Sequence, residues 1–183
     1  IYITTDGGGN TTSVNAVNIF GSGDVVDYGD YSDVKLLTST ERITQNGDKI
    51  TFRTDDKKVY YQGTMEQVET PWDISVRYYL DGKEYEASEI AGKSGKLEIH
   101  LSIKENTACK GNFYDRYALQ ASLTLDSEIC ENISAPDATI ANVGSDKQLT
   151  YTVLPGKGLA ASIKADVKDF EMESISINGI RLN

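Results

Sequence analysis

Hydrophobic and polar residues alternate along much of the chain, and the pattern is clearest around residues 74–80. Apolar side chains occupy every second position there, which is the period of a half-buried β-strand. Asp81-Gly82 follows at once and predicts a two-residue hairpin turn, because a type I′ turn needs positive φ at both central residues. The register of this hairpin sets Arg77 opposite Glu86.

The same alternation recurs in residues 96–104, 117–125, 148–154 and 159–167. Only residues 88–91 have the composition of a helical turn, and no stretch has a convincing amphipathic helical period. The pattern predicts an all-β protein with an antiparallel, immunoglobulin-like β-sandwich. We expect its core to contain these residues: Leu97, Ile99, Leu101, Leu119, Ala121, Leu123, Tyr151 and Ile163.

A break in the pattern near residue 70 divides the chain. Residues 65–70 are polar and acidic, and Pro71 holds the preceding residue in an extended conformation. We expect a smaller β-rich unit over residues 1–70 and the sandwich over residues 71–183. The stretch between them is either a linker or a crossover within one domain.

Composition and charge restrict the classes of partner. The chain has 183 residues, is 39% hydrophobic and 25% charged, and carries a net charge of −10. This charge repels nucleic acid and anionic lipid, so neither is an expected partner. No apolar run is long enough to span a membrane, and the chain begins at Ile1 rather than Met. We therefore expect part of a longer protein, attached to a membrane only through segments outside this chain.

Catalytic motifs find little support in the sequence. Gly92-Lys93-Ser94 is similar to the end of a phosphate-binding loop, but Ala87 stands where that motif needs glycine and a strand follows. His100, the only histidine, lies on the polar side of a predicted strand, whereas catalytic groups are concentrated in loops. The carboxylates form no recognisable pair for glycoside hydrolysis. We predict a non-enzymatic protein without a cofactor.

Aspartates recur every third residue at Asp24, Asp27, Asp30 and Asp33. Calcium binds carboxylate oxygens in flexible loops, so the first three are a calcium candidate. The spacing differs from that of an EF-hand, and it favours a solvated acidic loop. We therefore predict no metal site and keep these residues as the alternative.

Tyrosines are frequent near the division of the chain, and they suggest a surface for stacking on sugars. Adjacent tyrosines in a strand point to opposite faces of the sheet, so one of each pair is exposed or lies at an interface. The candidate ligand-binding residues are Tyr61, Trp72 and Tyr79. Strands also prefer aromatic residues, so packing of these side chains in the core or between units is the favoured interpretation.

Two cysteines are present, at Cys109 and Cys130. A disulfide between them would close a loop of about twenty residues and add about 3 kcal/mol in the chain-entropy estimate. Free buried thiols are the alternative. Two cysteines indicate little about the redox compartment.

Four segments carry a resemblance to a known group of proteins: VYYQGT at residues 59–64, YYLDGKEYEASEIAGKSGKLEI at 78–99, LTLDSEICENI at 123–133 and TVLPG at 152–156. They resemble the N-terminal extracellular region of uncharacterised membrane-associated proteins of Gram-positive bacteria, similar to the YhgE/Pip (phage infection protein) class. The resemblance implies an ectodomain, with transmembrane anchoring in other segments. It covers strands and turns, and it includes no catalytic motif.

Together these observations predict a non-enzymatic extracellular domain of a Gram-positive cell-surface or membrane-anchored protein. Its role would be structural or interactive, with an unknown protein or cell-envelope component as the partner. The alternative is an adhesin-like module that binds a glycan or another ligand through the exposed tyrosines.

Overall fold

The computed structural model describes residues 1–65 and 69–182, and its regular secondary structure consists almost entirely of antiparallel strands. The chain forms two compact units. The first contains Ile1–Tyr2 and Thr12–Val68, and the second contains Ile3–Thr11 and Glu69–Asn183. The division expected at residue 70 therefore misses the N-terminal strand, which belongs with the second unit. Part of the predicted linker, residues 66–68, lies outside the described residues.

The first unit has two small sheets around one core. One sheet has the order β2-β7-β4 and the other β3-β6-β5. The strands are β2 (Thr11–Phe20), β3 (Gly23–Tyr28), β4 (Asp33–Leu36), β5 (Thr44–Asn46), β6 (Lys49–Thr54) and β7 (Val59–Met65). Five side chains are buried together between them: Val25, Ile50, Phe52, Val59 and Tyr61.

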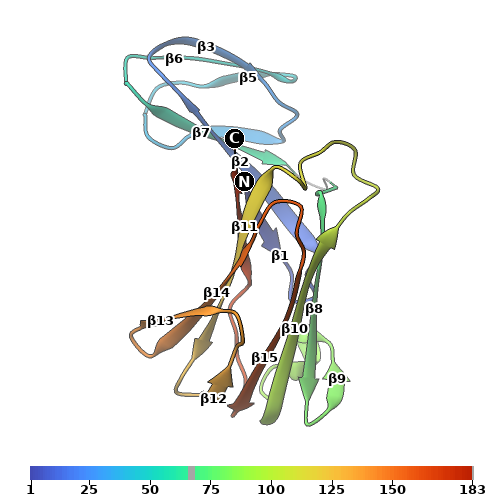
Figure 1. The fold of residues 1–183 in the computed structure, drawn as a ribbon. Helices are drawn as coiled ribbons and strands as arrows, with labels where there is room; N and C mark the ends of the chain where they lie inside the picture. Colours follow the sequence, from blue (N-terminus) through green and yellow to red (C-terminus); the bar gives the residue numbers. More distant parts are fainter. Residues whose placement is uncertain (66–68, 183) are drawn as a thin grey trace. The chain divides into compact units, whose positions relative to one another are not determined.

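The second unit is a β-sandwich, and Figure 1 labels its strands apart from β16. One sheet follows the order β13-β14-β11-β16-β1 and the other β12-β15-β10-β8-β9. The first comprises β1 (Tyr2–Thr5), β11 (Tyr117–Asp126), β13 (Thr139–Val143), β14 (Asp146–Val153) and β16 (Ser176–Arg181). The second comprises β8 (Trp72–Leu80), β9 (Lys83–Tyr85), β10 (Gly95–Glu105), β12 (Cys130–Ser134) and β15 (Leu159–Val167).

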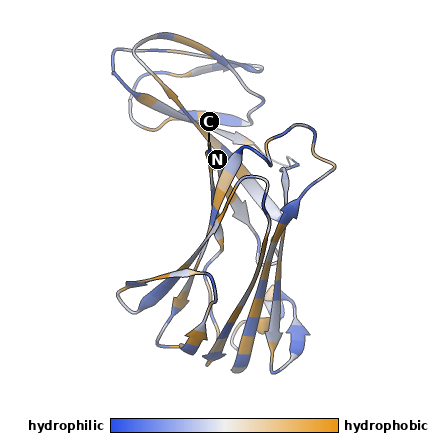
Figure 2. Cartoon of the chain, viewed as in Figure 1, coloured by the Kyte–Doolittle hydropathy of each residue, from blue (hydrophilic) through white to orange (hydrophobic). Residues whose placement is uncertain are grey.

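Alternation of side chains along these strands builds the core of the sandwich. Strands β10 and β15 show alternating hydrophobic and hydrophilic bands in Figure 2. Their apolar faces turn inward, and the polar faces form the outside of the sheet. The predicted core is confirmed, since all eight of its residues are at most 2% exposed: Leu97, Ile99, Leu101, Leu119, Ala121, Leu123, Tyr151 and Ile163.

The hairpin predicted at Asp81-Gly82 is confirmed. Leu80 pairs with Lys83, and both turn residues have positive φ, 49° at Asp81 and 82° at Gly82. The partner expected for Arg77 is wrong, because β9 ends at Tyr85 and the guanidinium instead lies 3.9 Å from the carboxylate of Glu84. Strand side chains reach diagonal neighbours as well as direct ones.

A single helical turn, α1 (Ala87–Ile90), follows β9, close to the turn expected at residues 88–91. Its one buried side chain, Ile90, attaches it to the second unit. In the part of the chain that the structure describes, no helix has the length and apolar character needed to cross a membrane. Strand β13 forms an edge of its sheet, and all five of its residues are exposed.

Candidate functional site

Two of the three aromatic residues expected to bind a ligand are buried. Tyr61 is 0% exposed and stacks on Phe20 at a centroid distance of 5.8 Å, while its hydroxyl donates a hydrogen bond to Asp27. Trp72 is 4% exposed and packs edge-on against Tyr117. The expected exposure of these two rings is therefore wrong, because large apolar rings gain most free energy by packing in a core.

Tyr79 lies on the outer face of the sheet that contains β8, β10 and β15, and it is half-buried. Its ring contacts the imidazole of His100 at a centroid distance of 4.9 Å. Strand pairing explains the contact, since Glu98 is opposite Tyr79 and His100 follows two residues later on the same face. Among the three predicted residues, Tyr79 alone can reach an external ligand.

A hydrogen-bonded group surrounds this ring contact. Glu98 Oε1 accepts a hydrogen bond from His100 Nε2 at 2.7 Å and another from Ser162 Oγ at 3.1 Å. The hydrogen bond from His100, followed by that from Ser162, holds the pKa of Glu98 below its usual value of 4.5. We call Tyr79, Glu98, His100 and Ser162 the outer-face group.

An open depression of about 650 Å³ adjoins the outer-face group. Small side chains form part of its floor, including Ser75, Ser102 and Ala160, and the register brings these three side by side on adjacent strands. Arg77 and Lys104 supply positive charge at its margin. The depression thus offers both hydrogen-bond donors and hydrogen-bond acceptors on one sheet.

The hydroxyl of Ser162 contacts the carboxylate of Glu98, a weak base because its pKa is lowered, and it does not contact the imidazole of His100. Activation of a serine needs a base within hydrogen-bonding distance of its oxygen. The arrangement can orient His100 and bind polar groups.

The calcium candidates take part in other interactions. Asp24 and Asp27 lie in β3, three residues apart and so on opposite faces of the strand. Asp24 forms an ion pair with Arg53 at 3.3 Å, and Asp27 accepts the hydroxyl of Tyr61. Asp30 is exposed after the strand. Over β3 the predicted acidic loop is wrong, because Val25 is buried and anchors the strand to the core.

The candidate disulfide is wrong, since Cys109 and Cys130 are free thiols. Cys130 is in register with Val167, which in turn pairs with Gly95 at the beginning of β10. Cys109 follows the other end of that strand, which is about 33 Å long at the usual rise per residue. A disulfide requires Cα atoms within about 7 Å.

Sequence reasoning missed the two hydrogen bonds that Glu98 accepts, one from His100 and one from Ser162. The alternation in residues 96–104 places Glu98 and His100 on one face, which was a usable signal. Ser162 arrives through the pairing of β10 with β15, which joins residues more than 60 positions apart. No local pattern gives that register.

Comparisons with known proteins give no match: no family model matches the chain, and no curated protein matches it either. Within residues 1–65 and 69–182, no group of three or more His, Cys, Asp or Glu side chains is arranged to hold a metal ion.

Proposed function

We propose that the chain is a non-enzymatic, extracellular interaction domain of a Gram-positive cell-surface protein, and that it binds through the outer face of the sheet β12-β15-β10-β8-β9. Its partner is a protein or another component of the cell envelope. Membrane attachment belongs to other segments of the protein, and neither a cofactor nor nucleic acid takes part. The second unit serves as an immunoglobulin-like module in this proposal.

The observation that carries the proposal is the outer-face group beside the depression of about 650 Å³. The outer face of a sandwich sheet is commonly a polar surface whose side chains contact only water. Here Glu98 holds His100 and Ser162 in fixed positions, and Tyr79 packs against the imidazole. Side chains that are already ordered lose less conformational entropy on binding.

The surrounding chemistry also supports recognition of a partner. Arg77 and Lys104 lie beside Glu98 and Asp73, so both signs of charge occur within one face. Interfaces use such mixed charges for specificity, and they are enriched in tyrosine and arginine. The extracellular location rests on the resemblance of the turns and strands to ectodomains of the YhgE/Pip class.

A photocrosslinker introduced at one position tests this proposal. Ser102 lies in the depression, whereas Gln120 is exposed on β11 of the other sheet and is the matched control. With Gram-positive envelope preparations, we expect crosslinked products from the Ser102 position and few from the Gln120 position. Equal yields from both positions, or no products from either, would overturn the proposal.

A second candidate is binding of a glycan, which the accessibility of Tyr79 favours. Its ring already lies on one side against His100, so a sugar would use the remaining edge together with the polar groups of the depression. A glycan array with the wild type, Tyr79→Ala and Gln120→Ala distinguishes this candidate. We expect Tyr79→Ala alone to lose any signal, and an array without signal excludes the glycan.

A further inference from the structure

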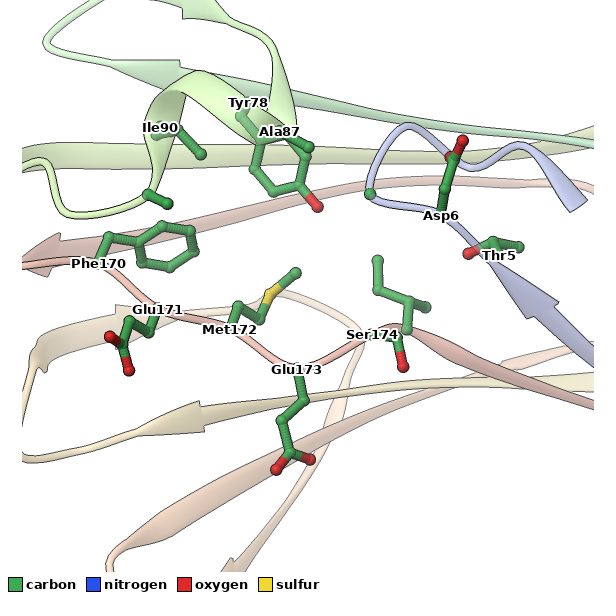
Figure 3. Close-up of a pocket in the computed structure, with 13 residues that line it drawn as sticks. Thr5, Asp6, Tyr78, Ala87, Ile90, Phe170, Glu171, Met172, Glu173 and Ser174 are labelled. Atoms are coloured by element: carbon green, nitrogen blue, oxygen red, sulfur yellow. The ribbon is translucent and has the colours of Figure 1, made fainter. Parts of the chain in front are cut away.

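A pocket of about 310 Å³ lies within the second unit, between β1, β8, α1 and the segment that joins β15 to β16 (Figure 3). Its volume is at the lower end of the range for small-molecule sites. The residues that line it do not overlap with the outer-face group or its depression. It is therefore a candidate ligand site that is independent of the outer face.

Tyr78 presents its hydroxyl to this pocket. The residue is 3% exposed, and Figure 3 shows the oxygen directed into the space that the lining residues surround. No hydrogen bond from the described part of the chain reaches this oxygen. In that part of the chain, two side-chain polar atoms are fully enclosed without a partner, Thr5 Oγ1 and the Tyr151 hydroxyl, and the Tyr78 oxygen is not one of them. The Tyr78 hydroxyl is therefore accessible to an occupant of the pocket, whereas Thr5 Oγ1 is not.

The phenol of Tyr78 is a hydrogen-bond donor at neutral pH. Burial, followed by the negative charge of Asp6, raises its pKa to about 12, so the phenol keeps its proton. A donor that is removed from water without an acceptor loses the free energy of its hydration. A ligand that brings an acceptor atom to this hydroxyl would recover that loss.

Apolar side chains form the rest of the interior. Phe170, Ile90 and Ile175 are each at most 3% exposed. Figure 3 shows the thioether of Met172 directed toward the Tyr78 hydroxyl. A methionine side chain adapts to the shape of its neighbours, so Met172 can adjust to an apolar ligand. Burial of an apolar body against these side chains favours binding.

The carboxylates that border the pocket are directed elsewhere. Figure 3 shows those of Glu171 and Glu173 pointing away from the Tyr78 hydroxyl. The carboxylate of Asp6 accepts hydrogen bonds within its own turn. None of the described residues that line the pocket is a lysine or an arginine. The interior therefore offers no counter-charge to an ionic ligand, and burial of an unpaired charge is costly.

We propose that this pocket binds a neutral molecule that combines a carbonyl acceptor with a compact apolar body. The carbonyl oxygen accepts the hydrogen bond of the Tyr78 phenol, and the apolar body packs on Phe170 and Met172. A purely apolar ligand would leave the phenol without an acceptor, and an ionic ligand would lose its hydration without gaining a counter-charge.

Two sources offer this chemistry: a free carbonyl compound and a leucine unit of a peptide. Titrations of the whole chain followed by amide NMR separate them, with cyclohexanone as the free compound and Nα-acetyl-leucine methylamide as the peptide unit. Saturable shifts at Tyr78, Phe170 and Met172 with either probe support the proposal. Binding of the leucine probe with equal or greater affinity assigns the site to peptides, and binding of cyclohexanone alone assigns it to free carbonyl compounds.

Matched ligands and variants test the neutral character of the ligand and the role of the phenol. We expect cyclohexylammonium and cyclohexanecarboxylate to bind at least about tenfold more weakly than cyclohexanone, because each must bury a charge without a partner. Tyr78→Phe keeps the ring and removes the donor, so it should weaken binding of cyclohexanone about fivefold, the usual effect of one hydrogen bond. The control Tyr151→Phe removes an enclosed hydroxyl outside the pocket and should leave the affinity unchanged.

Folding of the variants is monitored in the same spectra. Tyr78→Phe removes a hydroxyl that makes no hydrogen bond to the described residues, so we expect unchanged peak dispersion and a melting temperature at or above that of the wild type. An absence of saturable shifts with both probes would overturn the proposal, as would an affinity for cyclohexylammonium or cyclohexanecarboxylate equal to that for cyclohexanone. Wild-type affinity for cyclohexanone in Tyr78→Phe would also overturn it.

Discussion

Asp81 holds the β8–β9 turn against the first residues of β10 through Lys96. The carboxylate of Asp81 accepts a hydrogen bond from the amide of Lys96 at 2.9 Å, and the amide of Asp81 donates to the Lys96 carbonyl at 2.9 Å. The same residue adopts positive φ, which aspartate and asparagine tolerate better than most residues. One side chain thus supports both the turn and its attachment to the neighbouring strand.

Replacement of this side chain should destabilise the second unit. We expect Asp81→Ala to lower the free energy of unfolding by about 2 kcal/mol, because it loses a charge-assisted hydrogen bond and strains a left-handed residue. Asp81→Asn keeps an acceptor oxygen and the tolerance for positive φ, so it should cost less than about 1 kcal/mol. Urea unfolding followed by circular dichroism measures both. Equal losses in the two variants would show that the charge alone matters.

Two buried tyrosine hydroxyls should respond in opposite directions to the same substitution. The hydroxyl of Tyr151 is buried without a hydrogen-bond partner among the residues that the structure describes, whereas that of Tyr61 donates to Asp27. Tyr151→Phe should leave the free energy of unfolding unchanged or raise it by up to about 1 kcal/mol, because an unpaired hydroxyl is removed. Tyr61→Phe should lower it by about 1–3 kcal/mol. Urea titrations of both variants test the pair, and a loss of stability in Tyr151→Phe would contradict the assignment.

The two thiols should differ in reactivity. Cys130 is 2% exposed, and burial raises the pKa of its thiol to about 11, so little thiolate forms at neutral pH. Cys109 is partly exposed in the loop after β10. A thiol reagent such as Ellman's reagent should modify one cysteine in the folded protein and both in denaturant. No reaction in denaturant would indicate a disulfide and contradict the structure.

Acid should weaken the outer-face group through Glu98. Hydrogen bonds from His100 and Ser162 lower the pKa of this carboxyl from its usual 4.5, so the unfolded chain binds its proton more readily than the folded one. Its contribution to stability is therefore present above about pH 4.5 and is lost as pH falls through the folded-state pKa. In Glu98→Gln, the free energy of unfolding should decline less steeply below that pH.

Urea titrations over about four pH units, from roughly pH 3 to pH 7, measure this slope. Glu131→Gln is the matched control, because Glu131 is exposed on β12 of the same sheet. An unchanged slope in Glu98→Gln would mean that the hydrogen bonds from His100 and Ser162 do not favour the ionised form.

The sequence predicted the features that local chemistry determines. Asp81-Gly82 specifies its turn through backbone conformation, and strict alternation identified the inward face of β10. Prediction from the sequence failed where packing between distant segments determines which side chains are buried. Tyr61 is buried by its contact with Phe20, and Trp72 by its contact with Tyr117. No residue close to them in the sequence predicts either contact.

The candidate sites were less accessible to sequence reasoning than the fold. Tyr79 and His100 meet because β8 and β10 pair in one register, and Ser162 joins them from β15. The pocket at Tyr78 is assembled from segments more than 70 residues apart along the chain, including Thr5 and Phe170. That the Tyr78 hydroxyl has no partner among the described residues is a property of three-dimensional packing, so no sequence pattern marks it.

The exposed edge strand β13 makes the colloidal behaviour of the protein depend on its charge. The strand carries no charged residue and no proline, and Ile140 and Val143 are 46% and 61% exposed. Such an edge can pair with the same strand of another molecule, and natural edges usually prevent this with charges or bulges. Here the net charge of −10 supplies long-range repulsion instead, and it vanishes near the isoelectric point of 4.6. Self-association should therefore increase in mildly acidic or high-salt solution, and the protein is best concentrated at neutral pH.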